Sequence, residues 1–156
     1  MNSLKAQEQA YWESYLDSMP EDRRPNEAFI SAGYAGNSEI TDELLGLYLS
    51  GRKTAGSSIL EDFLAAGVPP PKVGNYWIYL NSFGMPSCIL RTEEVVTHKF
   101  RDVPEEIAIA EGEGDLSLDY WKKIHSELYF PFLKSWGVGD INSATVITEF
   151  FSVVYR

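Results

Sequence analysis

Residues 76–97, YWIYLNSFGMPSCILRTEEVVT, are the stretch that decides the fold. Residues 76–80 alternate between two faces, with Tyr76, Ile78 and Leu80 on one of them, which is the period of a β-strand. Residues 82–86 contain Gly and Pro and are typical of a turn, and residues 87–97 form a second β-rich run. The stretch therefore predicts a β-hairpin.

Other elements follow outward from this hairpin. Before it, the patterns predict a helix over residues 3–18, a loop over 20–37, a helix over 39–50, and a helix over 58–66 that stops at Gly67. After it, they predict a helical turn over 104–110, a helix over 117–130 capped by Ser117, and a strand over 143–155. This order predicts an α+β fold, with a small barrel or curled sheet and helices around it.

Length and composition fit one ordinary domain of 156 residues, without a disulfide or metal to stabilise it. Cys88 is the single cysteine, which favours a reducing compartment. No apolar run is long enough for a membrane span, and the first residues lack the pattern of a signal peptide. We therefore expect a soluble, cytoplasmic protein that does not bind membranes.

The charge is strongly negative, with 13 Lys and Arg against 23 Asp and Glu, a formal net charge of −10. Proteins that bind nucleic acid draw much of their affinity from cations placed on phosphates. The charge therefore argues against extended duplex DNA along the surface. It leaves room for a local pocket, since a few residues can reverse the sign of the field nearby.

Residues 51–58, GRKTAGSS, and residues 111–115, EGEGD, are two polar clusters that could carry chemistry. In the first, Lys53 offers a charge beside hydroxyls and the start of the next predicted helix, an arrangement that favours an anion. The alternative is a solvated turn between helices. In the second, the close acids suggest a general base or a partner for Lys53, and the alternative is a solvated acidic loop.

Trp121 and His125 share one face of the predicted helix over 117–130 with Leu118 and Leu128. His125 should therefore face inward or line a cleft, either as a functional group or as a structural histidine. The two histidines, His98 and His125, have no nearby cysteine, so we expect no metal site at either of them.

Glu149 lies among apolar residues on one face of the last predicted strand. A carboxylate in such a place needs a partner, and Arg91 and Lys53 are the candidates. The alternative is an edge position in contact with solvent.

Taken together in order, several stretches resemble the ASCH domain family, which is related to the PUA fold. The matching stretches are residues 42–45, 49–55, 71–76, 84–86, 91–95, 100–103 and 110–115, together with Leu118, Trp121, His125, Glu149 and Phe150. They cover roughly residues 40–156. The predicted helix over 3–18 resembles the N-terminal extension of the longer subfamily.

The resemblance implies a small PUA-like β-barrel with flanking helices, in which residues 1–37 form the helical extension and 38–156 the ASCH domain. It implies RNA or nucleotide-related ligands in a cleft between barrel and helices. Two activities are associated with members: hydrolysis of an acetylated cytidine nucleoside, and metal-dependent cleavage of RNA. Of the family signature Gly-x-Lys-x-x-Glu-x-Arg, Gly51 and Lys53 match, whereas Gly56 and Ser58 replace the Glu and Arg. Gly56 also stands where the amidohydrolase members have Thr.

The preferred hypothesis is a domain that binds RNA, a nucleotide or a nucleoside. The first alternative is an acylated-nucleoside hydrolase, with Lys53, Glu111 and Glu113 as catalytic groups. The second is a ribonuclease, in which Glu111, Glu113 and Asp115 would gather a divalent metal; no other cofactor is expected. A protein-interaction module is a further class. The candidate ligand-binding residues are Gly51, Arg52, Thr54, Ser57, Ser58, Arg91, Asp115, Trp121, His125 and Glu149.

Overall fold

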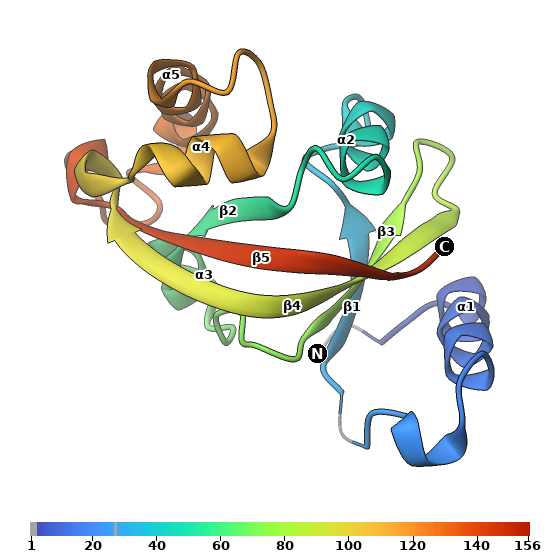
Figure 1. Ribbon diagram of the computed structural model, residues 1–156. Helices are drawn as coiled ribbons and strands as arrows, with labels where there is room; N and C mark the ends of the chain where they lie inside the picture. The colour runs from blue at the N-terminus through green and yellow to red at the C-terminus, as the bar shows by residue number, and fades with distance from the viewer. Residues whose placement is uncertain (1–2, 27) are drawn as a thin grey trace. The chain divides into compact units, whose positions relative to one another are not determined.

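The computed structural model describes residues 3–26 and 28–156 (Figure 1). The chain divides into two compact units. The first unit comprises Met1–Gly51, Val73–Glu93 and Phe151–Arg156, and the second comprises Arg52–Lys72 and Glu94–Phe150. Each unit has its own hydrophobic core and is described by itself.

Five strands are hydrogen-bonded in the order β1-β3-β4-β5-β2. Their bounds are β1 Ile30–Tyr34, β2 Ala55–Ile59, β3 Tyr76–Leu80, β4 Pro86–Lys99 and β5 Thr145–Tyr155. β3 and β4 pair antiparallel, which confirms the predicted hairpin. β1 runs parallel to β3 and β2 antiparallel to β5, so the strand pairing is mixed. The strands and the helices described below confirm the predicted α+β class.

The first unit contains helix α1 Ala6–Asp17, the short 3-10 helix Glu21–Arg23 and helix α2 Thr41–Leu49. α1 packs its aromatic side chains on β3, where the ring centroids of Trp12 and Tyr76 lie 5.0 Å apart. Cys88 on β4 is fully buried, and this burial raises the pKa of its thiol to about 11. The thiol is therefore protonated and shielded from solvent.

The predicted loop over residues 20–37 is wrong in its second half, because β1 lies there. Pro25, Gly33 and Gly36 are poor strand formers, and they hid this strand. Its conformation comes from pairing with β3, where Gly33 lies opposite Tyr79. Distant hydrogen bonds thus override a weak local preference.

The second unit contains helices α3 Leu60–Ala66, α4 Glu105–Glu111 and α5 Leu118–Tyr129. Three 3-10 helices, Phe100–Asp102, Phe130–Phe132 and Ile141–Ser143, connect its elements. As predicted, Ser117 caps α5, since its Oγ accepts a hydrogen bond from the Tyr120 N–H at 3.1 Å. Gly67 ends α3 in the left-handed conformation, also as predicted. The core of this unit packs α4 and α5 against β2 and β5 through Ile59, Ile107, Ala108, Trp121, Tyr129 and Val146.

Two predictions for the second unit are wrong. Ser58 does not start a helix but lies in β2, opposite Ile147 of β5. The Gly-Ser-Ser sequence has no strand propensity of its own, and it extends because the β-branched residues of β5 pair with it. Leu128 is 54% exposed, whereas the next residue, Tyr129, is 7% exposed and takes the inward position on α5.

Among the described residues, no helix has both the length and the apolar character that a membrane crossing requires.

Candidate functional site

Lys53 lies two residues before β2 and has only 5% of its side-chain surface exposed. Its Nζ is 2.9 Å from Glu113 Oε2 and 3.5 Å from Glu111 Oε1, and it also donates to the Glu111 carbonyl oxygen at 3.3 Å. A buried ammonium is costly unless it is paired and hydrogen-bonded, and these contacts meet that need. The predicted pairing of Lys53 with the acidic segment is therefore present in the second unit.

Glu111, the last residue of α4, is the centre of the polar network and is 2% exposed. Besides Lys53, it accepts hydrogen bonds from the Ser57 hydroxyl, at 2.9 Å, and from the Trp121 indole N–H. Burial by itself would raise the pKa of Glu111. The contacts with His125, Lys53 and Trp121 outweigh burial and hold that pKa at about 2, so the carboxylate stays ionised.

Two glycines allow the loop after α4 to hold these carboxylates. Gly112 has φ +67°, and a Cβ at this position would lie 2.1 Å from the carbonyl oxygen of Arg52. Next to this close approach, the Thr54 N–H donates to the Ala110 carbonyl at 2.7 Å. Gly114 likewise touches the ring of Tyr120, 2.3 Å from where its Cβ would be. The positive φ favours glycine at both positions, and a side chain would collide with the Arg52 backbone at Gly112 and with the Tyr120 ring at Gly114.

His125 lies one turn after Trp121 on α5, and its ring stacks on the indole with centroids 4.0 Å apart. Its Nδ1 is 2.8 Å from the Trp121 carbonyl oxygen, which can only accept, so Nδ1 carries a proton. Its Nε2 is 3.6 Å from Glu111 Oε1. A second proton on Nε2 would make the ring a cation beside Glu111.

Ser57 connects the network to β5. Its hydroxyl lies 2.8 Å from Thr148 Oγ1, while its carbonyl accepts from the Tyr129 hydroxyl at 3.2 Å. Burial raises the pKa of Tyr129, as do the charges of Glu111, Glu113 and Asp62, so the phenol is a donor throughout the normal pH range. Ser57 is thus a precisely held hydroxyl next to an ionised carboxylate.

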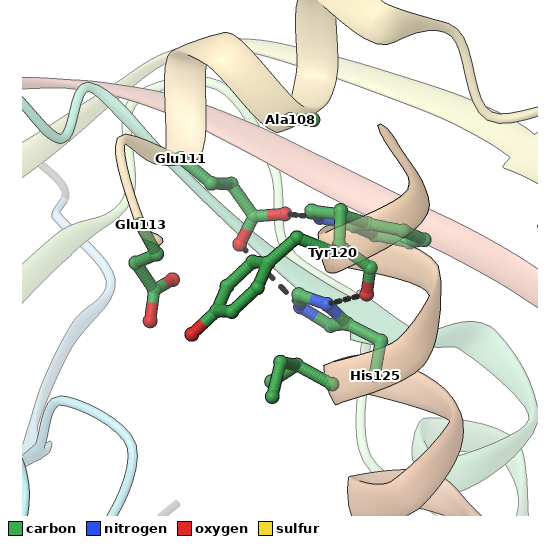
Figure 2. Close-up of a pocket in the computed structure, with 7 residues that line it drawn as sticks. Ala108, Glu111, Glu113, Tyr120 and His125 are labelled. Carbon is green, nitrogen blue, oxygen red and sulfur yellow. Dashed lines mark hydrogen bonds and ion pairs between the residues drawn. The ribbon is translucent and has the colours of Figure 1, made fainter. Parts of the chain in front are cut away.

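A pocket lies beside this network (Figure 2). Figure 2 shows the Glu111 side chain near the centre of the lining residues, with Glu113, Tyr120 and His125 around it. The pocket combines carboxylates with aromatic and apolar surface, a composition typical of small-molecule sites. Its lining residues are Ala108, Glu111, Glu113, Tyr120, Trp121, Ile124 and His125.

Six of the sequence-predicted residues belong to one contact network in the second unit. They are Lys53, Ser57, Glu111, Glu113, Trp121 and His125. Thr54 joins its edge, where its hydroxyl donates to the Ala110 carbonyl at 3.2 Å. Thr148, Tyr120 and Ile124 were not foreseen. Tyr120 and Ile124 could have been found as neighbours of Trp121 and His125 on the same helix, whereas nothing local marks Thr148.

Arg52, Ser58 and Asp115 belong to the second unit but make none of these contacts. Arg52 is exposed, and Ser58 points to the opposite face of β2 from Ser57 by the alternation of a strand. Asp115 is exposed and accepts from the Ser117 N–H at 2.9 Å, which places its carboxylate at the start of α5.

The remaining predicted residues lie elsewhere. Gly51 follows α2 in the first unit with φ +80°, and Arg91 of the first unit pairs with Glu93. Glu149 is buried on β5 opposite Gly56, and the alternation of the strand directs it away from the face of Thr148.

Metal ligation was predicted only for the ribonuclease alternative. Within residues 3–26 and 28–156, no group of three or more His, Cys, Asp or Glu side chains is arranged to hold a metal ion. The carboxylates of Glu111 and Glu113 instead face Lys53.

The comparisons with known proteins identify the family. The ASCH domain family model matches residues 29–155, and the chain belongs to that family. The predicted boundary between an extension over 1–37 and a domain over 38–156 stays a prediction. A search of the curated proteins finds no match to this chain.

Solved structures agree with this assignment. The ASCH domain from Lactobacillus crispatus JV V101 is 27% identical with a TM-score of 0.90, over 99% of this chain and 98% of its own. Protein EF3133 from Enterococcus faecalis V583 is 28% identical with a TM-score of 0.78, over 94% and 87%. Hypothetical protein PH0355, at 11% identity and a TM-score of 0.51 over 81% and 99%, shares the fold alone. The predicted PUA-like ASCH fold is confirmed.

Proposed function

We propose that the site in the second unit binds the base of an RNA, nucleotide or nucleoside ligand. The observation that carries this proposal is the Lys53–Glu113 ion pair at 2.9 Å, in which Glu113 borders a pocket that also contains Tyr120 and Trp121. A base needs a flat apolar surface and hydrogen-bonding groups aimed at its edge. The pocket is lined by aromatic rings and by the carboxylates of Glu111 and Glu113.

The charges favour a base over a phosphate at this spot. Lys53, Glu111 and Glu113 together carry one more negative charge than positive, so they do not attract an anion. Arg52, the residue before Lys53, is exposed and makes no ion pair with the described residues. It is the group that we assign to a phosphate attached to the bound nucleoside.

Binding can be tested by titrating the protein with nucleosides and nucleoside monophosphates while recording the indole N–H resonance of Trp121. This N–H donates to Glu111, so a ligand in the pocket should shift it. Lys53→Ala should weaken binding by about tenfold or more, since it frees two carboxylates to repel each other. Lys123→Ala, an exposed cation on α5, is the control. Absent shifts in the wild type, or unchanged affinity in a folded Lys53→Ala variant, would contradict the proposal.

A second candidate function is hydrolysis of an acylated nucleoside, which the position of Ser57 favours. Its hydroxyl is held between Glu111 Oε2 and Thr148 Oγ1 at 2.9 and 2.8 Å, as an activated nucleophile would be. A pKa of about 2 makes Glu111 a weak base, however, so Glu113 is the better candidate for taking a proton.

Release of acetate from N4-acetylcytidine tests this second candidate. We expect Ser57→Ala to abolish any turnover and Ser58→Ala to preserve it, because Ser58 lies on the other face of β2. A folded wild-type protein that releases no acetate would leave only the binding function.

A further inference from the structure

We propose that Glu113 and Tyr120 make this pocket selective for guanine. The inference rests on the proposed base-binding function and names the base. It begins with two polar groups at the pocket that have acceptor or donor capacity unused by the described residues.

The first group is the Glu113 carboxylate, whose side chain is 30% exposed. Lys53 Nζ bonds its Oε2 at 2.9 Å and so fixes its direction. Its Oε1 has no hydrogen-bond partner among residues 3–26 and 28–156. Since an ionised carboxylate has about four acceptor positions and no donor, Glu113 presents an acceptor-only edge to a ligand.

The second group is the Tyr120 hydroxyl. The Tyr120 ring packs on the backbone of Gly114, in the same loop that carries Glu113. Figure 2 shows its hydroxyl end on the side of the pocket where the Glu113 carboxylate lies. Within the described part of the chain this hydroxyl makes no hydrogen bond. It can therefore donate to a ligand acceptor beside Glu113.

Guanine matches this pair of groups in chemistry. Its Watson–Crick edge presents two neighbouring N–H donors, at N1 and N2, followed by the O6 acceptor. The donors suit the Glu113 carboxylate, and O6 suits the Tyr120 hydroxyl. Neutral adenine and cytosine place a ring-nitrogen acceptor beside their amine, and uracil places carbonyls on both sides of its N–H. These acceptors would face the carboxylate, and unpaired polar groups in a pocket are strongly disfavoured.

Wild-type protein provides the first test, by calorimetric titration with guanosine, inosine, adenosine, cytidine and uridine. We expect guanosine to bind most tightly. Inosine, which lacks only the N2 amine, should bind about tenfold more weakly. Binding of several nucleosides without a preference for guanosine would overturn this inference and leave the proposed function standing. Binding of none would overturn both.

Variants test whether Glu113 and Tyr120 are the source of the preference for guanosine. Glu113→Gln keeps the side-chain shape but replaces one acceptor oxygen with a donor, so guanosine affinity should fall about tenfold while adenosine and cytidine affinities change much less. Tyr120→Phe should narrow the gap between guanosine and the other nucleosides by severalfold. Asp119→Asn, which removes an exposed charge from the same helix, should leave the order unchanged. An equal loss for all nucleosides in Glu113→Gln would contradict base selection by this carboxylate.

Discussion

Glu111 shows how the environment of one residue sets its chemistry. It is nearly fully buried, which alone would favour the neutral acid, yet its surroundings supply a cation and several donors. The result is a group that is ionised at neutral pH and contacts Lys53, Ser57 and Trp121. Its role is therefore to position other side chains, whereas Glu113, partly exposed, is the carboxylate that a ligand can reach.

The pH dependence of stability follows from the pKa of Glu111. Because this pKa is about 2 in the folded chain, below its ordinary value of 4.5, ionised Glu111 stabilises the folded state. The contribution is fully present above pH 4.5 and is lost as the pH falls towards 2, by about 3 kcal/mol in all. Urea unfolding across this range measures it, and carboxyl NMR of Glu111 gives the midpoint directly.

The control for this prediction is Glu111→Gln, which cannot ionise at this position. Its free energy of unfolding should depend less steeply on pH between 4.5 and 2 than that of the wild type. Parallel curves, or an NMR midpoint near 4.5 for Glu111, would contradict the network described above.

Arg52 should contribute to the binding affinity for nucleotides but not to the affinity for nucleosides. It is exposed, precedes Lys53 in the sequence and does not belong to the buried network, and our proposal assigns it to the ligand phosphate. We expect Arg52→Ala to weaken a nucleoside monophosphate about threefold to tenfold and to leave the nucleoside unchanged. Calorimetry with each ligand pair measures the difference. An equal loss of affinity for both ligands would contradict the assignment of Arg52 to the phosphate.

At the scale of elements, the loop after α4 contains two glycines in close contacts, one with a backbone carbonyl and one with an aromatic ring. Gly112 meets the carbonyl of Arg52, and Gly114 meets Tyr120. These contacts explain the alternating Glu and Gly of residues 111–114: the glycines allow the close approach, and the glutamates make the ion pairs. The segment therefore holds the loop against Arg52 and Tyr120 and also supplies the carboxylates of the site.

Gly112→Ala tests the close contact between Gly112 and the Arg52 carbonyl, and Gly137→Ala is its matched control. Both glycines have positive φ, +67° and +72°, but a Cβ at Gly137 meets nothing within 4 Å. The control should lose about 1 kcal/mol from the backbone conformation alone. Gly112→Ala should lose about 3 kcal/mol or more, because the Arg52 backbone must also move. If thermal or urea unfolding gave similar losses of stability for the two variants, the backbone around Gly112 would be able to move away from the added Cβ at little energetic cost.

The sequence predicted these elements unevenly, for physical reasons. α5 was found because its cap and its apolar face are local signals. β1 and β2 were missed because Gly33, Gly56 and Ser57 have little strand propensity and extend only through pairing with distant strands. In the site, a pairing of Lys53 with Glu111 or Glu113 was expected. The Ser57–Thr148 contact was not, since 91 residues separate its members and the register of β2 on β5 creates it.

For the whole molecule, the net charge of −10 has the same sign as the net charge of Lys53, Glu111 and Glu113. Neither the surface average nor the ion-paired Lys53 favours a long polyanion. Nucleoside binding should therefore depend on short-range hydrogen bonds. Calorimetry in about 0.05 and 0.5 M salt should give nucleoside affinities within about twofold of each other. A steep fall with salt would show that binding is governed by charge, and would contradict base recognition.

The burial of Cys88 has a practical consequence for such experiments. Its thiol is fully buried with a pKa of about 11, so at neutral pH it presents almost no thiolate to an alkylating reagent. A cysteine introduced at an exposed position, such as Lys123→Cys on α5, should react alone with a maleimide dye. Fluorescent reporters can thus be attached one at a time to the otherwise native chain, with Cys88 left in place.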